Sequence, residues 1–103
     1  MKTISPAELQ SLLTTDADIV DVREPDEWSR GHLAGALNWP LSRLQRGEWP
    51  DLGALAKPGV LYCQAGVRSA RALELLRPHA SLLRHLTGGL NAWSGALVPS
   101  ASA

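Results

Sequence analysis

The residues best suited to carry out chemistry lie between Cys63 and Arg68, where the sequence reads CQAGVR. Cys63 is the only cysteine of the chain. An apolar run typical of a strand, residues 60–62, precedes it, and a helical pattern with Ser69 as its expected N-cap follows. The thiol is therefore expected in the turn between a strand and a helix.

A turn of this kind favours negatively charged groups. Backbone N–H groups that enter a helix lack partners and, together with the helix dipole, form a cup for an anion. A thiolate in that cup is stabilised, so we expect the pKa of Cys63 to fall below the free value of roughly 8.5. Gly66 lets the loop curl tightly, and Arg68 adds a permanent cation. The pattern indicates an activated sulfur nucleophile, whereas a cysteine by itself is more typical of a small buried hydrophobic residue.

The elements that must position this loop alternate between strands and helices along the chain. Strand patterns occupy residues 3–4, 19–22, 36–39, 60–62 and 83–86, and helical patterns occupy residues 6–13, 25–30, 41–44, 51–56, 70–76 and 90–96. This alternation predicts an α/β fold, a three-layer sandwich with a mainly parallel, roughly five-stranded central sheet flanked by helices.

Three segments follow the ends of predicted strands and are candidates for one common site. They are residues 21–23, 63–68 and 87–89. Sites in open α/β sheets gather at the carboxyl ends of the strands, so we expect these segments to share one rim. Asp21, Arg23 and Ser69 are then the residues expected to line or orient the loop. For Asp21 and Arg23 the favoured interpretation is a structural ion pair at the sheet edge.

Length and composition exclude several classes of function. The 103 residues suit one domain, expected over residues 1–97, with a flexible tail at 98–103. A formal net charge of zero argues against nucleic-acid binding, and one cysteine excludes an internal disulfide or a cysteine-rich zinc site. His79 and His85 have no other His, Asp or Glu residue at a spacing typical of metal ligands, so no metal site is expected. Without a predicted signal peptide or membrane span, the expected location is the cytoplasm.

Four stretches of the chain together resemble the rhodanese family of single-domain sulfurtransferases. They are DVREPDEW (21–28), GHLAGALNWP (31–40), CQAGVRS (63–69) and GGLNAW (88–93), in the order and spacing of the family. The resemblance covers nearly the whole chain and implies a thiosulfate sulfurtransferase type of enzyme with the sandwich fold described above.

The resemblance also implies a role for each part of the loop. Cys63 would take up a sulfane sulfur and become a persulfide, and Arg68 would bind an anionic donor, typically thiosulfate. The persulfide would be held by the backbone of Gln64, Ala65, Gly66, Val67 and Arg68. Cyanide, a small thiol or a protein thiol would accept the sulfur, no cofactor is implied, and we expect a monomer or a weak dimer. Arg68 is the loop's only charged side chain, and family members with a second basic residue in this loop attract thiosulfate more strongly. Another persulfide is therefore a second candidate donor.

Three alternatives remain open from the sequence. Phosphatases and arsenate reductases that resemble this fold use one more residue between cysteine and arginine, so the C-x4-R spacing here favours sulfur transfer. A non-enzymatic module would use the loop to carry a persulfide to one partner or to sense sulfide. A core cysteine in an unrelated α/β domain would be unreactive toward alkylating reagents near neutral pH.

Overall fold

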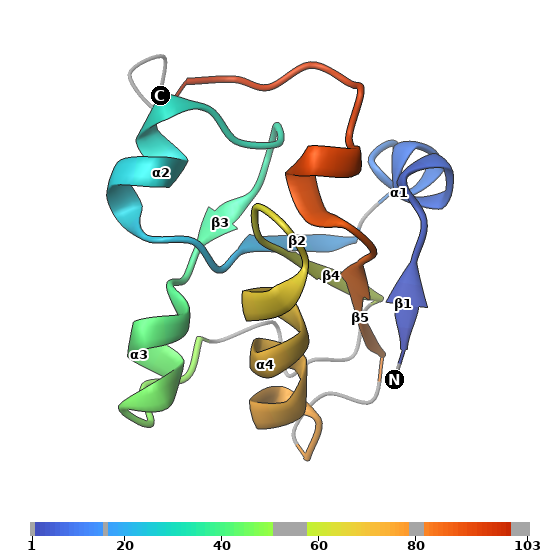
Figure 1. Cartoon of the computed structure of the whole chain (residues 1–103). Coiled ribbons are helices and arrows are strands. Elements are labelled where there is room, and N and C mark those ends of the chain that lie inside the picture. The colour runs from blue at the N-terminus through green and yellow to red at the C-terminus, as the bar shows by residue number, and fades with distance from the viewer. Residues whose placement is uncertain (1, 16, 51–57, 79–81, 100–103) are drawn as a thin grey trace.

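The computed structural model describes residues 2–15, 17–50, 58–78 and 82–99, which build a five-stranded parallel sheet with helices on both faces (Figure 1). The strands are β1 (Thr3–Ile4), β2 (Asp18–Asp21), β3 (Leu37–Asn38), β4 (Gly59–Tyr62) and β5 (Leu83–Leu86). The helices are α1 (Pro6–Leu12), α2 (Pro25–Arg30), α3 (Leu41–Gln45), α4 (Val67–Leu76) and the 3-10 helix η2 (Gly89–Ala92). The strand order is β1-β5-β4-β2-β3.

The register of the central strands brings the predicted rim segments together. Strand β4 lies between β2 and β5, and all four of its residues are buried. Asp21 pairs with Tyr62 across β2 and β4, so Cys63 and Arg23 both leave the sheet at its carboxyl edge. The segment after β5 reaches the same edge, because Leu90 N–H donates to the Cys63 carbonyl at 3.0 Å. The prediction of one shared rim is therefore confirmed.

Two hydrophobic cores make the fold a three-layer α/β sandwich, as the alternation of elements predicts. Val20 and Leu61 face α3 and α4 and share a core with Cys63. On the other face, Val60 and Tyr62 pack toward α1 and η2. Figure 1 shows α3 and α4 side by side on one side of the strands and α1 with η2 on the other. The alternate residues of β4 thus supply both cores.

Local signals place the start of α1 correctly. Ser5 is its N-cap and Pro6 its first residue, and a reciprocal capping box joins Ser5 and Glu8. The Ser5 hydroxyl accepts from Glu8 N–H at 3.1 Å, and the Glu8 carboxylate accepts from Ser5 N–H at the same distance. The helix expected at residues 51–56 lies outside the described residues.

Two helix boundaries differ from the prediction. Ser69 is not the N-cap of α4, because the helix begins at Val67 after Gly66, whose φ of 99° only glycine adopts easily. The closing helix expected at residues 90–96 is a 3-10 helix that ends at Ala92. Beyond it the chain extends toward α2, where Val98 and His32 exchange two backbone hydrogen bonds of 2.8 and 2.9 Å. This bridge includes Val98 in the folded chain, one residue past the boundary expected at 97.

None of the helices in the described ranges is long and apolar enough to cross a lipid bilayer.

Candidate active site

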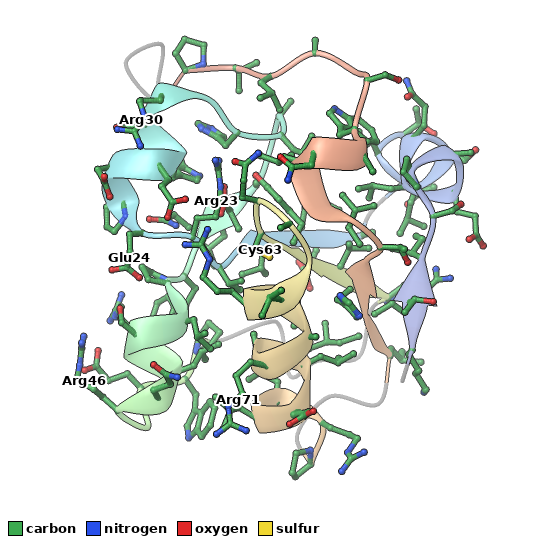
Figure 2. The ribbon with its side chains drawn as sticks, viewed as in Figure 1. Arg23, Glu24, Arg30, Arg46, Cys63 and Arg71 are labelled. Carbon is green, nitrogen blue, oxygen red and sulfur yellow. The ribbon has the colours of Figure 1, made fainter. Side chains whose placement is uncertain are left out.

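The loop between β4 and α4 wraps around the sulfur of Cys63. Gly66 N–H points at Sγ from 3.0 Å and Ser69 N–H from 3.4 Å. Cys63 itself is only 1% exposed, whereas Ala65 and Val67 on the outer side of the loop are exposed. Figure 2 shows Cys63 at the centre of the molecule, at the base of the loop that leads into α4. The expected cup of backbone donors is thus present and is centred on the sulfur.

The surroundings of Cys63 favour its thiolate form. Burial raises the pKa of the thiol, but hydrogen bonds from the Ser69 hydroxyl and from Ser69, Gly66 and Ala65 N–H groups lower it more, so the pKa lies below its usual value. A thiolate at this position is a nucleophile that needs no separate base.

Ser69 connects the sulfur to a buried histidine. Its Oγ lies 3.5 Å from Cys63 Sγ and 3.1 Å from Nδ1 of His85, which is 8% exposed. Burial lowers the pKa of His85, so the ring is neutral near pH 7. A neutral ring that carries its proton on Nδ1 donates to Ser69 Oγ, and the hydroxyl proton is then shared between the sulfur and the Gly66 carbonyl, which lies 3.3 Å from Oγ. Ser69 therefore contacts the sulfur from within α4 and does not cap the helix.

Removal of the Ser69 hydroxyl is expected to raise the pKa of Cys63. The Ser69→Ala variant loses a donor to the thiolate, and a hydrogen bond to a charged group contributes about 1.5–3 kcal/mol. Alkylation of Cys63 by iodoacetamide at neutral pH should slow by about tenfold or more. The measurement is the alkylation rate across a pH series, with Ser69→Thr as the variant that retains a hydroxyl. An unchanged pH profile in Ser69→Ala would assign Ser69 a packing role only.

The predicted anion-binding residue, Arg68, is engaged by a carboxylate from α2. Its NH1 lies 2.5 Å from Glu27 Oε1 and its NH2 lies 2.9 Å from Oε2, so both prongs of the guanidinium are used. The hydrogen bonds from Arg68, against a smaller effect of burial, lower the pKa of Glu27 to about 2. Glu27 is thus ionised at every physiological pH. It is a site residue that the sequence-based prediction missed.

Asp21 and Arg23 form the expected ion pair. Their side chains are 0% and 6% exposed, and Arg23 NH2 lies 2.8 Å from Asp21 Oδ2. Arg23 also donates to Gly31 O at 2.6 Å and to Gln64 Oε1 at 3.3 Å. The pair therefore links the end of β2 both to the end of α2 and to the loop.

The paired glycines at the start of η2, Gly88 and Gly89, let this segment lie against the loop. A Cβ at Gly89 would approach Cys63 O to 2.5 Å, closer than real contacts allow. Asn91 N–H donates to Gln64 O at 2.9 Å, and Gln64 Nε2 donates to Asn91 Oδ1 at 2.7 Å. The loop backbone is thereby held from behind, with its N–H groups directed at the sulfur.

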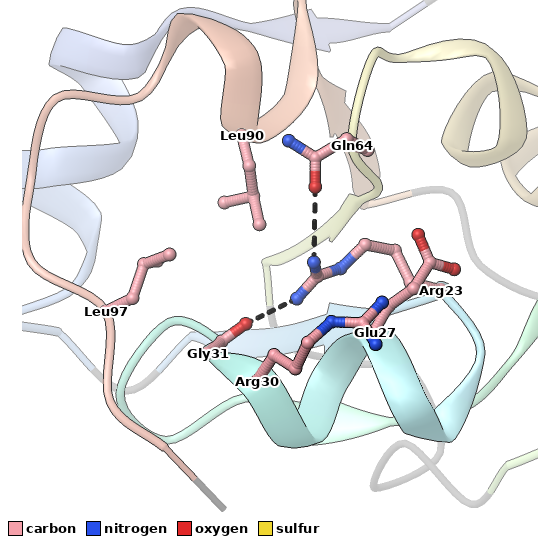
Figure 3. Close-up of a pocket in the computed structure, with 7 residues that line it drawn as sticks. All are labelled: Arg23, Glu27, Arg30, Gly31, Gln64, Leu90 and Leu97. Carbon is pink, nitrogen blue, oxygen red and sulfur yellow. Dashed lines mark hydrogen bonds between the residues drawn. The ribbon is translucent and has the colours of Figure 1, made fainter.

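A cavity of about 280 Å³ lies beside the loop (Figure 3). It is lined by Arg23, Glu27, Arg30, Gly31, Gln64, Leu90 and Leu97. Figure 3 shows two leucine side chains on one wall and charged side chains from α2 on the other, with Gln64 reaching Arg23 between them. The loop therefore borders a site of mixed character that is large enough for a small organic group.

The remaining sequence candidates lie outside this arrangement. Arg71 is 55% exposed and pairs with Glu74, as expected for a solvated helix residue. In the described part of the chain, no group of three or more His, Cys, Asp or Glu residues could hold a metal ion.

Comparison with known proteins identifies the family of this domain. The family model for the rhodanese-like domain matches residues 5–96. The chain belongs to the rhodanese family. It is 46% identical over 100 residues to an uncharacterized protein of Synechocystis, covering 95% of this chain and 55% of the relative. It is 32% identical over 94 residues to the thiosulfate sulfurtransferase GlpE of Coxiella burnetii, covering 89% of this chain and 86% of GlpE.

A solved structure agrees with this assignment. The human single-domain sulfurtransferase TSTD1 is 31% identical and superposes with a TM-score of 0.78, covering 90% of this chain and 95% of TSTD1. This rhodanese chain spans about half the length of its Synechocystis relative, 55%, and most of the length of the two named sulfurtransferases. The resemblance found in the four sequence stretches is therefore confirmed at the level of the family.

Proposed function

We propose that this protein is a sulfurtransferase that carries a sulfane sulfur on Cys63. The observation that carries the proposal is the buried Cys63 sulfur with the N–H groups of Gly66 and Ser69 directed at it, at 3.0 and 3.4 Å. The similarity to GlpE and TSTD1 supports the same reaction class.

The reaction has two displacement steps. The Cys63 thiolate attacks the outer sulfur of thiosulfate, a new S–S bond forms, and sulfite leaves with the electron pair of the broken bond. An acceptor nucleophile, such as cyanide, a small thiol or a protein thiol, then attacks the outer sulfur of the persulfide. The Cys63 thiolate leaves and is ready again. The loop donors stabilise the negative charge on sulfur in both steps.

External groups complete the cycle. The chain has one cysteine, so an acceptor from solution or from another protein must remove the sulfur. The chemistry moves one sulfur atom and needs no cofactor. Thiosulfate or an organic persulfide supplies the sulfur, and the reducing cytoplasm, where thiols stay free, is the compartment that suits it. The domain acts as a monomer or a weak dimer.

Intact-mass spectrometry after incubation with thiosulfate tests the proposal. The expected result is a gain of one sulfur atom that cyanide reverses and that Cys63→Ala abolishes. A second incubation uses glutathione persulfide as donor. A gain with either donor supports the sulfur-carrying role, and slow release to every small acceptor would identify a carrier dedicated to one partner protein. No gain with either donor, from a protein whose thiol still alkylates, would overturn the proposal.

A further inference from the structure

We infer that Glu27 selects the sulfur donor by charge. Its carboxylate weakens the binding of dianions such as thiosulfate, so organic persulfides are the favoured donors. The inference rests on the proposed sulfur transfer. It concerns the first step, in which Cys63 S⁻ attacks the outer sulfur of R–S–SH, the new S–S bond forms, and R–S⁻ leaves with the electron pair while the proton stays on the transferred sulfur.

Glu27 occupies the anion-binding fork of the loop arginine. Both carboxylate oxygens face Arg68, at 2.5 and 2.9 Å, in the two-pronged geometry that a bound oxyanion would use. The pair is partly open to solvent, with side-chain exposures of 33% for Arg68 and 23% for Glu27. A dianionic donor can reach Arg68 only by competing with a carboxylate that is already in place.

The carboxylate is held in that position by its own helix. Glu27 Oε1 also accepts the backbone N–H of Glu24 at 3.1 Å, which closes a capping box at the start of α2. Movement of Glu27 away from Arg68 therefore also removes a hydrogen bond from the first turn of α2. Mild acid does not release it either, because its pKa of about 2 keeps it ionised.

The charges around the loop cancel in pairs. Arg68 is neutralised by Glu27, and Arg23 is neutralised by Asp21. Arg30, which also lines the cavity, lies 3.7 Å from Asp26, so a dianion at the rim meets no net positive charge from these residues. Once it displaces Glu27, that carboxylate repels it at short range.

The cavity beside Glu27 suits a donor with a carbon skeleton. Leu90 and Leu97 form one of its walls, and Gln64, a residue of the loop, also lines it (Figure 3). Thiosulfate has no apolar part to bury there, whereas the R group of an organic persulfide would bury apolar surface of these leucines and so bind more tightly. The volume of about 280 Å³ accommodates a group of amino-acid size.

The test compares donors in the Glu27→Gln variant. Glutamine at this helix position still accepts the Glu24 N–H, so the capping box is kept while the charge is removed. We expect the rate constant for sulfur loading of Cys63 by thiosulfate to rise by about tenfold or more, and to decrease with added salt. Loading by cysteine persulfide should change by less than about threefold. Time-resolved intact mass measures both rates, and circular dichroism verifies the fold.

Asp26→Asn is the matched control. Asp26 lies on the same helix, is 73% exposed and pairs weakly with Arg30 at 3.7 Å. The substitution removes one negative charge from α2 without releasing Arg68. It frees only Arg30, which lines the cavity but is 71% exposed, so thiosulfate loading should change by less than about twofold.

Each outcome decides between the two proposals. If Glu27→Gln loads thiosulfate at the wild-type rate or slower while cysteine persulfide still loads both proteins, Glu27 positions Arg68 instead and only the present inference fails. If Asp26→Asn accelerates thiosulfate as much as Glu27→Gln, the effect is general charge and the inference fails. If neither donor loads the wild type or the variant, the proposed sulfur transfer fails, and with it the inference.

Discussion

Replacement of Asp21 by alanine is expected to lower the free energy of unfolding by about 3–5 kcal/mol. Asp21 is fully buried and accepts hydrogen bonds from three groups of Arg23: the backbone N–H, Nε and NH2, at 2.8 to 3.1 Å. The Arg23 side chain is only 6% exposed, and without Asp21 its guanidinium would lie buried beside two uncharged acceptors, Gly31 O and Gln64 Oε1. A buried cation without its counter-charge destabilises the fold far more than the loss of a surface pair.

Urea denaturation of wild type and variants measures this effect. Asp26→Ala removes an exposed partner of Arg30 and should change stability by less than about 0.5 kcal/mol. The double variant Asp21→Ala/Arg23→Met removes both buried charges and should recover most of the lost stability. A loss below about 1 kcal/mol in Asp21→Ala would show that the pair is not the buried electrostatic link between β2, α2 and the loop.

Much of the fold follows from local patterns in the sequence. The β-branched run before Asp21, the capping box at Ser5 and Glu8, and the alternation of strands and helices predict the sheet and its layers. The misplaced boundaries have tertiary causes. Helix α4 starts early because Gly66 adopts a φ of 99° around the sulfur, and η2 stops early where the chain turns toward His32.

The candidate site is predictable only where its residues are neighbours in the chain. The loop from Cys63 to Arg68 is visible because a strand, a glycine, an arginine and a helix follow one another. Its partners are not visible: Glu27 is 41 positions from Arg68, and His85 is 16 from Ser69. Parallel β-strands joined by helical crossovers bring such distant residues to one edge, and no local pattern marks the pairs.

The start of α2 carries one weak sequence signal that could have pointed to Glu27. Glu27 follows Glu24 at the capping-box spacing, as Glu8 follows Ser5. That spacing predicts where the Glu27 carboxylate is held but not which cation it meets. The Asp21–Arg23 pair, between near neighbours in the chain, is predictable, whereas the Glu27–Arg68 pair is a property of the fold and is what a sequence-based assignment of the anion site misses.

The variant Gly89→Ala is expected to reduce sulfur loading of Cys63 by about a hundredfold, because a displacement of reacting groups by about 1 Å has an effect of that size. The new Cβ would lie 2.5 Å from Cys63 O and 2.6 Å from the backbone of Gln64, so the loop or η2 must move. The movement breaks the hydrogen bonds from Leu90 N–H and Asn91 N–H to these two carbonyls, at 3.0 and 2.9 Å. Loading by thiosulfate or cysteine persulfide, followed by intact mass, measures the loss.

Gly35→Ala separates this clash from backbone strain. Gly35 has a φ of 79° and Gly89 a φ of 59°, so alanine at either position carries left-handed strain of about 1–2 kcal/mol. A Cβ at Gly35 meets nothing within 4 Å, and that variant should lose stability while it keeps the wild-type loading rate. If both variants load equally well, the contact between η2 and the loop does not set the position of the sulfur. If only Gly89→Ala loses sulfur loading, the segment after β5 is as much a part of the active site as the loop itself. The N–H groups of Leu90 and Asn91 in this segment fix the carbonyls behind the Cys63 thiolate.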